Sequence, residues 1–247
     1  MIKQDKLGYR FSVEPFLLVD FANVYPKSKL IDVGTGSGII PVLMCQKYSD
    51  LKIVAIEIQQ SLSNLALENF QSSGLMSFIK LIYGDFLKVA KKIESLSFDL
   101  IISNPPYGKL NGGRVNPSPF KALARHEIKL NLLNLVETSF RLLKPNGRII
   151  LSYPIYRKFE VLQVLNILKL VPTRLRSVYG RPGAIAKFFL VEAVKSGTNS
   201  STKEDSIYIC KQDGSYSENM EKIYASFDYT NRSHRLRKKC DRSRACG

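Results

Sequence analysis

The sequence predicts an α/β fold in which a mostly parallel sheet lies between layers of helices. From Lys29 to about Val194, short β-branched runs alternate with longer helical patterns, which is typical of a doubly wound sheet. Most of the short runs are continuously apolar, as expected for strands covered on both faces. The chain of 247 residues, 45% of them hydrophobic and 23% charged, is long enough to bury one full core.

The alternation of strand and helix patterns gives a residue range for each expected element. The expected strands are 29–33, 52–56, 79–83, 98–103, 147–153, 173–178 and 188–193. The helical patterns between them cover 39–48, 59–72, 129–143 and 157–168.

The C-terminal part differs in composition from this region. Residues 196–206 are rich in Ser, Thr and Gly and indicate a linker. Residues 207–224 can form a short hairpin or helical appendage. Residues 228–247 contain seven basic residues, two acidic residues and almost no apolar ones, a composition that predicts disorder. We therefore expect a catalytic domain over 1–195, a linker with an appendage over 196–227, and a basic tail over 228–247.

The charge of the chain indicates its partners. A formal net charge of +16 attracts polyanions, of which nucleic acid is the commonest. A membrane surface is less favoured, because no segment pairs a basic face with a bulky apolar one. The sequence contains no CxxC pair, no apolar signal-peptide core and no apolar run of about 20 residues. We expect a cytoplasmic protein that binds RNA, without a metal or a membrane anchor.

A glycine-rich turn follows the first expected strand and opens a helix. It reads Asp32-Val33-Gly34-Thr35-Gly36-Ser37-Gly38. Glycines allow the backbone to turn sharply and to approach a ligand without Cβ clashes. By itself this turn is weak evidence for a nucleotide site.

Two more strand ends strengthen that interpretation. Glu57 ends the second strand, where a carboxylate can accept both ribose hydroxyl protons of an adenosine-containing cofactor. At the end of the third strand, Asp85 can bind an adenine amino group and Phe86 can flank the ring; the alternative for Asp85 is a helix N-cap. The glycine pattern GxGxG differs from the GxGxxG that binds a pyrophosphate, so S-adenosyl-L-methionine is favoured over NAD.

The fourth strand ends in Asn104-Pro105-Pro106-Tyr107. The two prolines stiffen the loop and remove two N–H donors. The Asn104 Oδ1 atom and the Pro105 carbonyl can each accept one proton of an sp² amino group. Tyr107 can stack on a base. The tetrapeptide therefore predicts methylation of an exocyclic amine, with Asn104, Pro105, Pro106 and Tyr107 as catalytic residues and Asn104 also beside the cofactor.

These motifs resemble those of class I, Rossmann-like amino-methyltransferases. More narrowly, the chain is similar to bacterial tRNA (adenine-N6) methyltransferases that modify the adenosine 3′ of the anticodon in a valine tRNA. The segments that carry the similarity are GYRFS from Gly8, DVGTGSGII from Asp32, NPPY from Asn104, ARHE from Ala124, LKPNGR from Leu143 and LVEA from Leu190.

The resemblance covers about Ile2 to Lys195. It implies seven strands with the last one antiparallel, a tRNA substrate, and an N-terminal segment, Gly8 to Pro15, over the cofactor. The family commonly has Asp-Ala where this chain has Glu14-Pro15.

Three other functions remain open. Methylation of guanine N2 in ribosomal RNA makes the same chemical demand on the loop. Methylation of a glutamine amide at N5 is disfavoured, because those enzymes carry a helical domain before the glycine turn and only 31 residues precede Asp32 here. A non-catalytic RNA-binding protein would not need Asn104, Tyr107 and Asp32. We also expect residues 108–124 to form a basic flap over the base, and Arg174 and Arg176 to belong to a basic cluster near the substrate.

Overall fold

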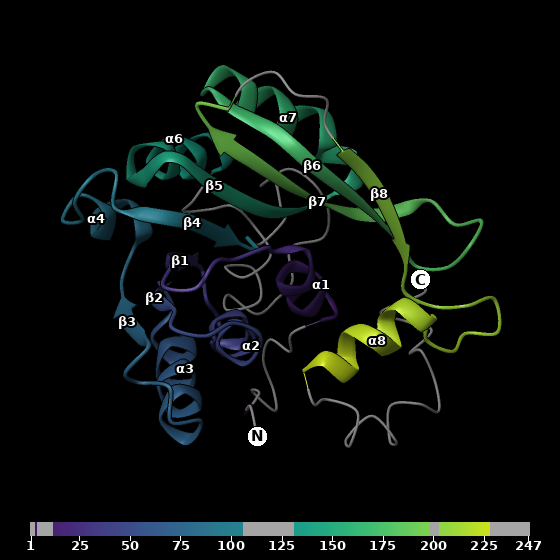
Figure 1. Cartoon of the computed structure of the whole chain (residues 1–247), viewed down its shortest axis with the longest axis horizontal. Helices are drawn as coiled ribbons and strands as arrows, with labels where there is room; N and C mark the ends of the chain where they lie inside the picture. Colours follow the sequence, from purple (N-terminus) through teal and green to yellow (C-terminus); the bar gives the residue numbers. More distant parts are fainter. Residues whose placement is uncertain (1–2, 4–11, 106–130, 198–202, 228–247) are drawn as a thin grey trace, which may run out of the picture.

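A single sheet of eight strands organises the protein (Figure 1). This computed structural model describes Lys3 and residues 12–105, 131–197 and 203–227. The strands follow the order β3-β2-β1-β4-β5-β7-β6-β8 across the sheet. Their bounds are β1 Lys29–Val33, β2 Lys52–Glu57, β3 Ile79–Tyr83, β4 Phe98–Ser103, β5 Leu143–Pro154, β6 Leu170–Tyr179, β7 Ala186–Lys195 and β8 Lys203–Tyr208.

The pairing confirms the expected mixed sheet. The first five strands pair in parallel, and β7 is antiparallel to both of its neighbours, β5 and β6. The seventh strand is therefore the reversed one, as expected. The expected count of seven strands is wrong, because β8 adds an eighth strand parallel to β6.

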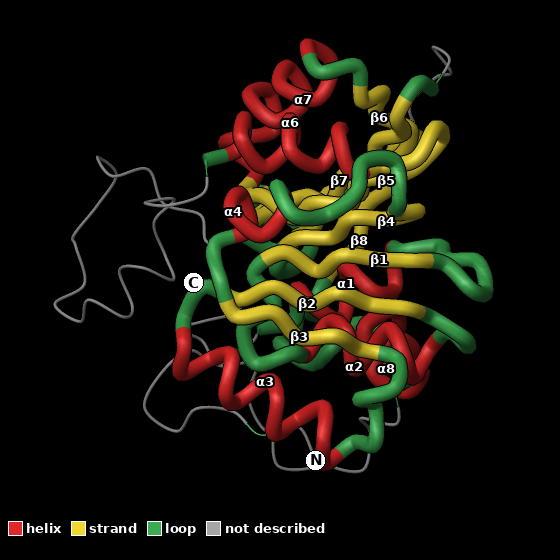
Figure 2. The backbone as a smooth tube through the Cα atoms, turned by 90° about the vertical axis from the view of Figure 1, so that its left-hand side faces the viewer, coloured by secondary structure: helices red, strands yellow, loops and turns green. Residues whose placement is uncertain are grey.

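Helices cover both faces of the sheet (Figure 2). Their bounds are α1 Glu14–Phe21, α2 Ile39–Lys47, α3 Gln60–Ser72, α4 Phe86–Ala90, α6 Leu132–Leu142, α7 Lys158–Ile167 and α8 Glu218–Ser226, with a 3-10 turn, η1, at Ile155–Arg157. Helices α1, α2, α3 and α8 contribute to one buried cluster, and α4, α6 and α7 to another.

The strands divide their side chains between these two clusters. In β1, Leu30 belongs to the cluster of α1 and α2, and Ile31 to that of α6 and α7. In β4, Leu100 and Ile102 face the first cluster and Ile101 the second. Successive side chains of a strand point to opposite faces. A strand buried on both faces must therefore be apolar throughout, which explains the continuous runs in the sequence.

The C-terminal appendage is part of this sheet. Sequence analysis missed strand β8 because its first four residues are polar and exposed. In the structure, β8 supplies hydrogen bonds to the outer edge of β6, which is ten residues long. The following helix α8 packs on α1, where Phe16 meets the rings of Tyr224 at 5.0 Å and Phe227 at 5.8 Å. The expected division of the chain at residue 195 stays a prediction.

Candidate active site

The register of the central strands brings the predicted site residues to one edge of the sheet. Val33 of β1 pairs with Ile56 of β2 and with Ser103 of β4, and Glu57 pairs with Tyr83 at the end of β3. The chain therefore leaves four neighbouring strands at the same level. Ligands of open α/β sheets bind at such carboxyl ends.

The glycine turn has the backbone that its sequence predicts. Gly34, Gly36 and Gly38 have φ angles of 74°, 60° and 81°, which residues with a Cβ rarely adopt. A Cβ on Gly34 or Gly36 would meet no atom of the described residues within 4 Å, so these two positions are open on that side. A Cβ on Gly38 would lie 2.5 Å from the ring of Phe70 in α3. Gly38 therefore serves the packing of the turn, and the other two glycines leave room beside it.

Two buried side chains hold this turn. The Glu57 carboxylate accepts hydrogen bonds from the backbone N–H groups of Gly36 and Gln59, each at 2.8 Å. Burial raises the pKa of Glu57, and these backbone hydrogen bonds lower it. Asn69 of α3 is fully buried. Its Nδ2 donates to the Ser37 carbonyl at 2.8 Å, and its Oδ1 accepts from the N–H of Lys3 at 2.7 Å. Sequence reasoning missed Asn69, because one polar residue in a helix carries no signal.

Asp32 is the unusual group of the site. Its side chain is 1% exposed, and neither carboxylate oxygen has a hydrogen-bond partner among the described residues. Burial raises the pKa of Asp32 to about 7; the nearby Thr35 hydroxyl opposes this shift, and the carboxylate of Glu57 adds to it. Buried polar atoms in proteins are almost always hydrogen-bonded. The two orphaned oxygens are therefore suited to a donor supplied by a ligand.

At the third strand end the structure shows the N-cap alternative for Asp85. Asp85 is the N-cap of α4, and its Oδ1 accepts from the N–H of Leu87 at 2.8 Å. Phe86 is 4% exposed and packs in the core with Ile31, Val33 and Ile56. The contacts of both residues with a cofactor stay predictions.

The fourth strand end brings in a residue that the motif analysis did not include. Asn104 and Pro105 directly follow β4, and Asn104 Nδ2 donates to the Glu14 Oε2 atom at 3.0 Å. Glu14 begins α1 and is followed by Pro15. An acid followed by proline ahead of an apolar run is a helix-start signal, and it could have located α1. Pro106, Tyr107, the flap 108–124 and the tail 228–247 lie outside the described residues, and so does the segment from Gly8 to Phe11.

A family comparison decides the class of protein. The model described as "Methyltransferase domain" matches residues 26–178, which contain the glycine turn and all four strand ends that build the site. The chain belongs to the methyltransferase domain family. The matched part spans well over half of the chain and includes Asp32, Glu57 and Asn104.

Individual relatives agree with this assignment. A protein of Flavobacteriaceae bacterium (strain 3519-10), named tRNA1(Val) (adenine(37)-N6)-methyltransferase, is 29% identical over 228 residues, which cover 92% of this chain and 94% of the relative. A predicted O-methyltransferase from Agrobacterium tumefaciens shares the fold with a TM-score of 0.66 at 15% identity, over 86% of this chain and 96% of that one. A SAM dependent methyltransferase from Aquifex aeolicus gives 0.53 at 17% identity, over 73% and 89%.

The protein is an S-adenosylmethionine-dependent methyltransferase. The residues at the strand ends fit this cofactor. The orphaned oxygens of Asp32 can accept from a cationic ammonium group. The open positions beside Gly34 and Gly36 leave space for a ligand against the backbone.

Two properties of the described residues bear on membranes and metals. Across Lys3 and residues 12–105, 131–197 and 203–227, no helix has the length and apolar character needed to cross a bilayer. The same residues contain no group of three or more His, Cys, Asp or Glu side chains arranged to hold a metal ion.

Proposed function

We propose that this methyltransferase modifies the exocyclic N6 of an adenine in tRNA, at the adenosine immediately 3′ of the anticodon in a valine tRNA. The observation that carries the proposal is the placement of Asn104 and Pro105 at the end of β4, next to the glycine turn of β1. The name of the Flavobacteriaceae relative supports the substrate, and the net charge of +16 supports an RNA partner.

The amine to be methylated needs acceptors in the plane of the base. The Asn104 Oδ1 atom and the Pro105 carbonyl are acceptors, and Pro106 has no N–H to compete with them. Two hydrogen bonds from the amine to these oxygens would draw electron density onto the nitrogen and fix its direction. Alignment of this kind is the main demand of the reaction, because the methyl donor is already activated.

S-adenosylmethionine, when bound, supplies a methyl group on a positively charged sulfur, and the new N–C bond forms as the S–C bond breaks and the sulfur keeps the electron pair. The proton released by the amine can leave to water after the transfer. Asp32 and the turn from Gly34 to Gly38 would hold the cofactor beside Asn104, and Glu57 would bind its ribose. The target base must leave its stack, since N6 is shielded by neighbouring bases, and Tyr107 is the residue we assign to stack on it.

The test is direct identification of the product nucleoside. The purified protein is incubated with isotopically labelled cofactor and, in separate reactions, with two unmodified valine tRNA transcripts, with ribosomal RNA and with a protein extract. One transcript has adenosine 3′ of the anticodon and the other has guanosine there. We expect labelled N6-methyladenosine from the first transcript only. Labelled N2-methylguanosine from ribosomal RNA would replace the proposal with guanine methylation. A labelled glutamine in a protein substrate, with no methylated RNA, would replace it with amide methylation.

A further inference from the structure

The hydrogen bond between Asn104 and Glu14 fixes the rotation of a carboxamide. Asn104 Nδ2 donates to Glu14 Oε2 at 3.0 Å across 90 positions of sequence. An ionised carboxylate only accepts, so the amide nitrogen of Asn104 must face Glu14. The half-turn alternative would place Oδ1 against a carboxylate oxygen, and these two acceptors repel each other. The orientation of the Asn104 carboxamide is therefore set by its hydrogen bond to Glu14 and not only by steric packing.

The direction of Asn104 decides which group a substrate would meet. With Nδ2 held by Glu14, Oδ1 points away from α1 as an acceptor. A rotated carboxamide would present its NH2 group instead, and a donor facing the NH2 of a base would be repelled. A preorganised polar contact of this kind contributes to catalysis because it does not have to rearrange during the reaction.

Helix α1, which carries Glu14, is held along its length. The residues Pro15 to Val19 are buried, and Phe16 packs edge-to-face on the ring of Tyr224 in α8. The Glu14 N–H donates to the Ser12 hydroxyl at 3.2 Å. The first turn of α1 therefore has a fixed position relative to the end of β4, although the two segments are far apart in sequence.

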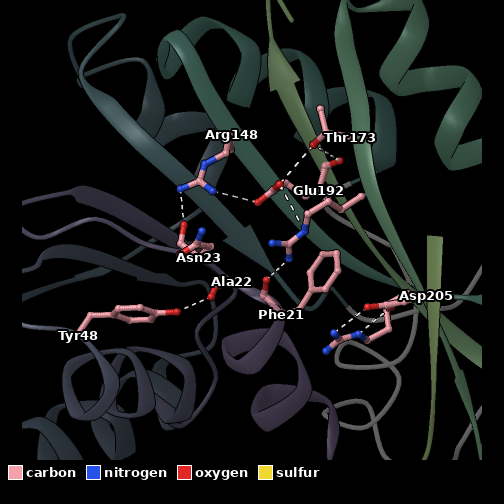
Figure 3. A network of polar contacts seen from close by, with 10 residues as sticks. Phe21, Ala22, Asn23, Tyr48, Arg148, Thr173, Glu192 and Asp205 are labelled. Carbon is pink, nitrogen blue, oxygen red and sulfur yellow. Dashed lines mark hydrogen bonds and ion pairs between the residues drawn. The ribbon is translucent and has the colours of Figure 1, made fainter. Parts of the chain in front are cut away.

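The other end of α1 is clamped by basic side chains from several elements (Figure 3). Its last carbonyl groups have no partner within the helix. Lys47 donates to the Val19 and Asp20 carbonyls at 3.1 and 3.2 Å. The remaining donors are Arg174 to Phe21, Tyr48 to Ala22 and Arg148 to Asn23. Cations at this end also interact favourably with the helix dipole.

Acidic residues in turn hold these arginines. The Glu192 carboxylate is 5% exposed and lies 3.1 Å from Arg148 and 3.6 Å from Arg174 (Figure 3). Arg176 binds Asp205 through two hydrogen bonds of 2.8 Å and Asp20 of α1 through a third. Arg174 and Arg176 are thus engaged with α1 and its neighbours. The clamp joins β5, β6, β7 and β8 to the helix that presents Glu14.

We propose that Glu14 is a positioning residue of this methyltransferase: it holds the Asn104 carboxamide so that Oδ1 faces the amine to be methylated. The proposal rests on the role that the proposed function gives Asn104. It predicts that Glu14 contributes to turnover through Asn104 and contributes little to the binding of either substrate.

The test compares a side chain at position 14 that can accept a hydrogen bond with one that cannot. Glu14→Gln keeps an amide oxygen that can accept from Asn104, whereas Glu14→Ala removes the acceptor. We expect Glu14→Ala to lower kcat by about tenfold or more, on the scale of one lost preorganised contact, and Glu14→Gln to stay within about threefold of the wild type. KM for tRNA and for the cofactor should change less than about twofold in both. Glu137→Gln, at an exposed position of α6 outside the clamp, is the matched control and should keep the wild-type kcat.

A double-mutant cycle separates action through Asn104 from independent action. Asn104→Ala should lower single-turnover methylation by about a hundredfold. Adding Glu14→Ala to Asn104→Ala should then cause no further loss, because the group that Glu14 positions is gone. Multiplication of the two single losses would overturn the proposal.

The remaining outcomes are also distinct. If Glu14→Ala keeps full turnover while Asn104→Ala does not, only the positioning role fails. A Glu14→Gln variant as slow as Glu14→Ala would overturn the orientation argument, and weakened cofactor binding with unchanged kcat would assign Glu14 to the cofactor instead. Full activity of Asn104→Ala would remove the proposed chemistry itself, whatever the Glu14 variants do.

Discussion

Burial of Asp32 predicts that cofactor binding depends on pH near neutrality. Its pKa is raised from 3.8 to about 7, chiefly by burial and against the opposing effect of the Thr35 hydroxyl. In the free protein the protonated form therefore predominates below pH 7. We expect the ionised carboxylate to be the form that accepts a hydrogen bond from the ammonium group of S-adenosylmethionine, so that binding releases a proton.

The magnitude follows from the titration of a single group. With a pKa of about 7, roughly one Asp32 in eleven is ionised at pH 6 and about three in four at pH 7.5. The affinity for the cofactor should therefore rise by about eightfold between these two pH values.

The same pKa shift makes the free energy of unfolding depend on pH. The folded-state pKa lies above the reference value, so the contribution to stability is full below about pH 3.8 and is lost as pH rises through 7. The difference amounts to about 4 kcal/mol at about 1.4 kcal/mol per pH unit.

Isothermal titration calorimetry at pH 6.0 and 7.5 measures this dependence, and buffers with different ionisation enthalpies count the protons released. Asp32→Asn should bind more weakly and lose most of the pH dependence. Glu57→Gln should retain a pH dependence, displaced to lower pH because the Glu57 carboxylate contributes to the raised pKa of Asp32, and it tests whether Glu57, whose pKa is also raised by burial, is the titrating group. An affinity that stays constant over this range, or a dependence that persists in Asp32→Asn, would refute the reasoning.

Four other predictions can be checked with single variants or a truncation. Gly38→Ala should lower the free energy of unfolding, measured in urea, by more than about 2 kcal/mol. Its φ of 81° is strained for alanine, and the new Cβ would lie 2.5 Å from an aromatic carbon of α3. Gly34→Ala should lower it less, because the position beside Gly34 is open. Glu192→Ala should cost about 3 kcal/mol in the same assay, since two arginines lose their buried partner, and a loss below 1 kcal/mol would mean that they find other partners. Tyr107→Phe should keep most methylation of tRNA and Tyr107→Ala should not, because stacking needs only the ring. Removal of residues 228–247, seven of which are basic, should weaken RNA binding in a filter assay and leave cofactor affinity unchanged; equal loss of both would contradict it.

The sequence by itself determined the fold class and the positions of most strands. The ranges expected for β1, β3 and β4 agree with the structure at both ends, because each strand is a short, mostly apolar run set between turns. The glycine turn was also readable, since positive φ at Gly34, Gly36 and Gly38 requires glycine. Such features depend on local backbone geometry and on the hydrophobic pattern, and both can be recognised from consecutive residues.

Helix α1 and strand β8 were recognised only with the tertiary structure, although the Glu14-Pro15 helix start stands in the sequence. Helix α1 is apolar around its circumference, because it lies among the sheet, α2 and α8, and this composition hides the helical period on which sequence analysis depends. Strand β8 was missed for the opposite reason. Its exposed polar residues have the composition of a loop, and they form a strand by pairing with the edge of β6.

The chemistry of the site was likewise decided by contacts between distant segments. The bond from Asn104 to Glu14 spans 90 positions, and that from Arg174 to Phe21 spans 153. The raised pKa of Asp32 comes from its burial in the folded protein. The motifs could name Asp32 and Asn104, but not the burial of the one or the orientation of the other. Both depend on which surfaces meet when the sheet and its helices pack.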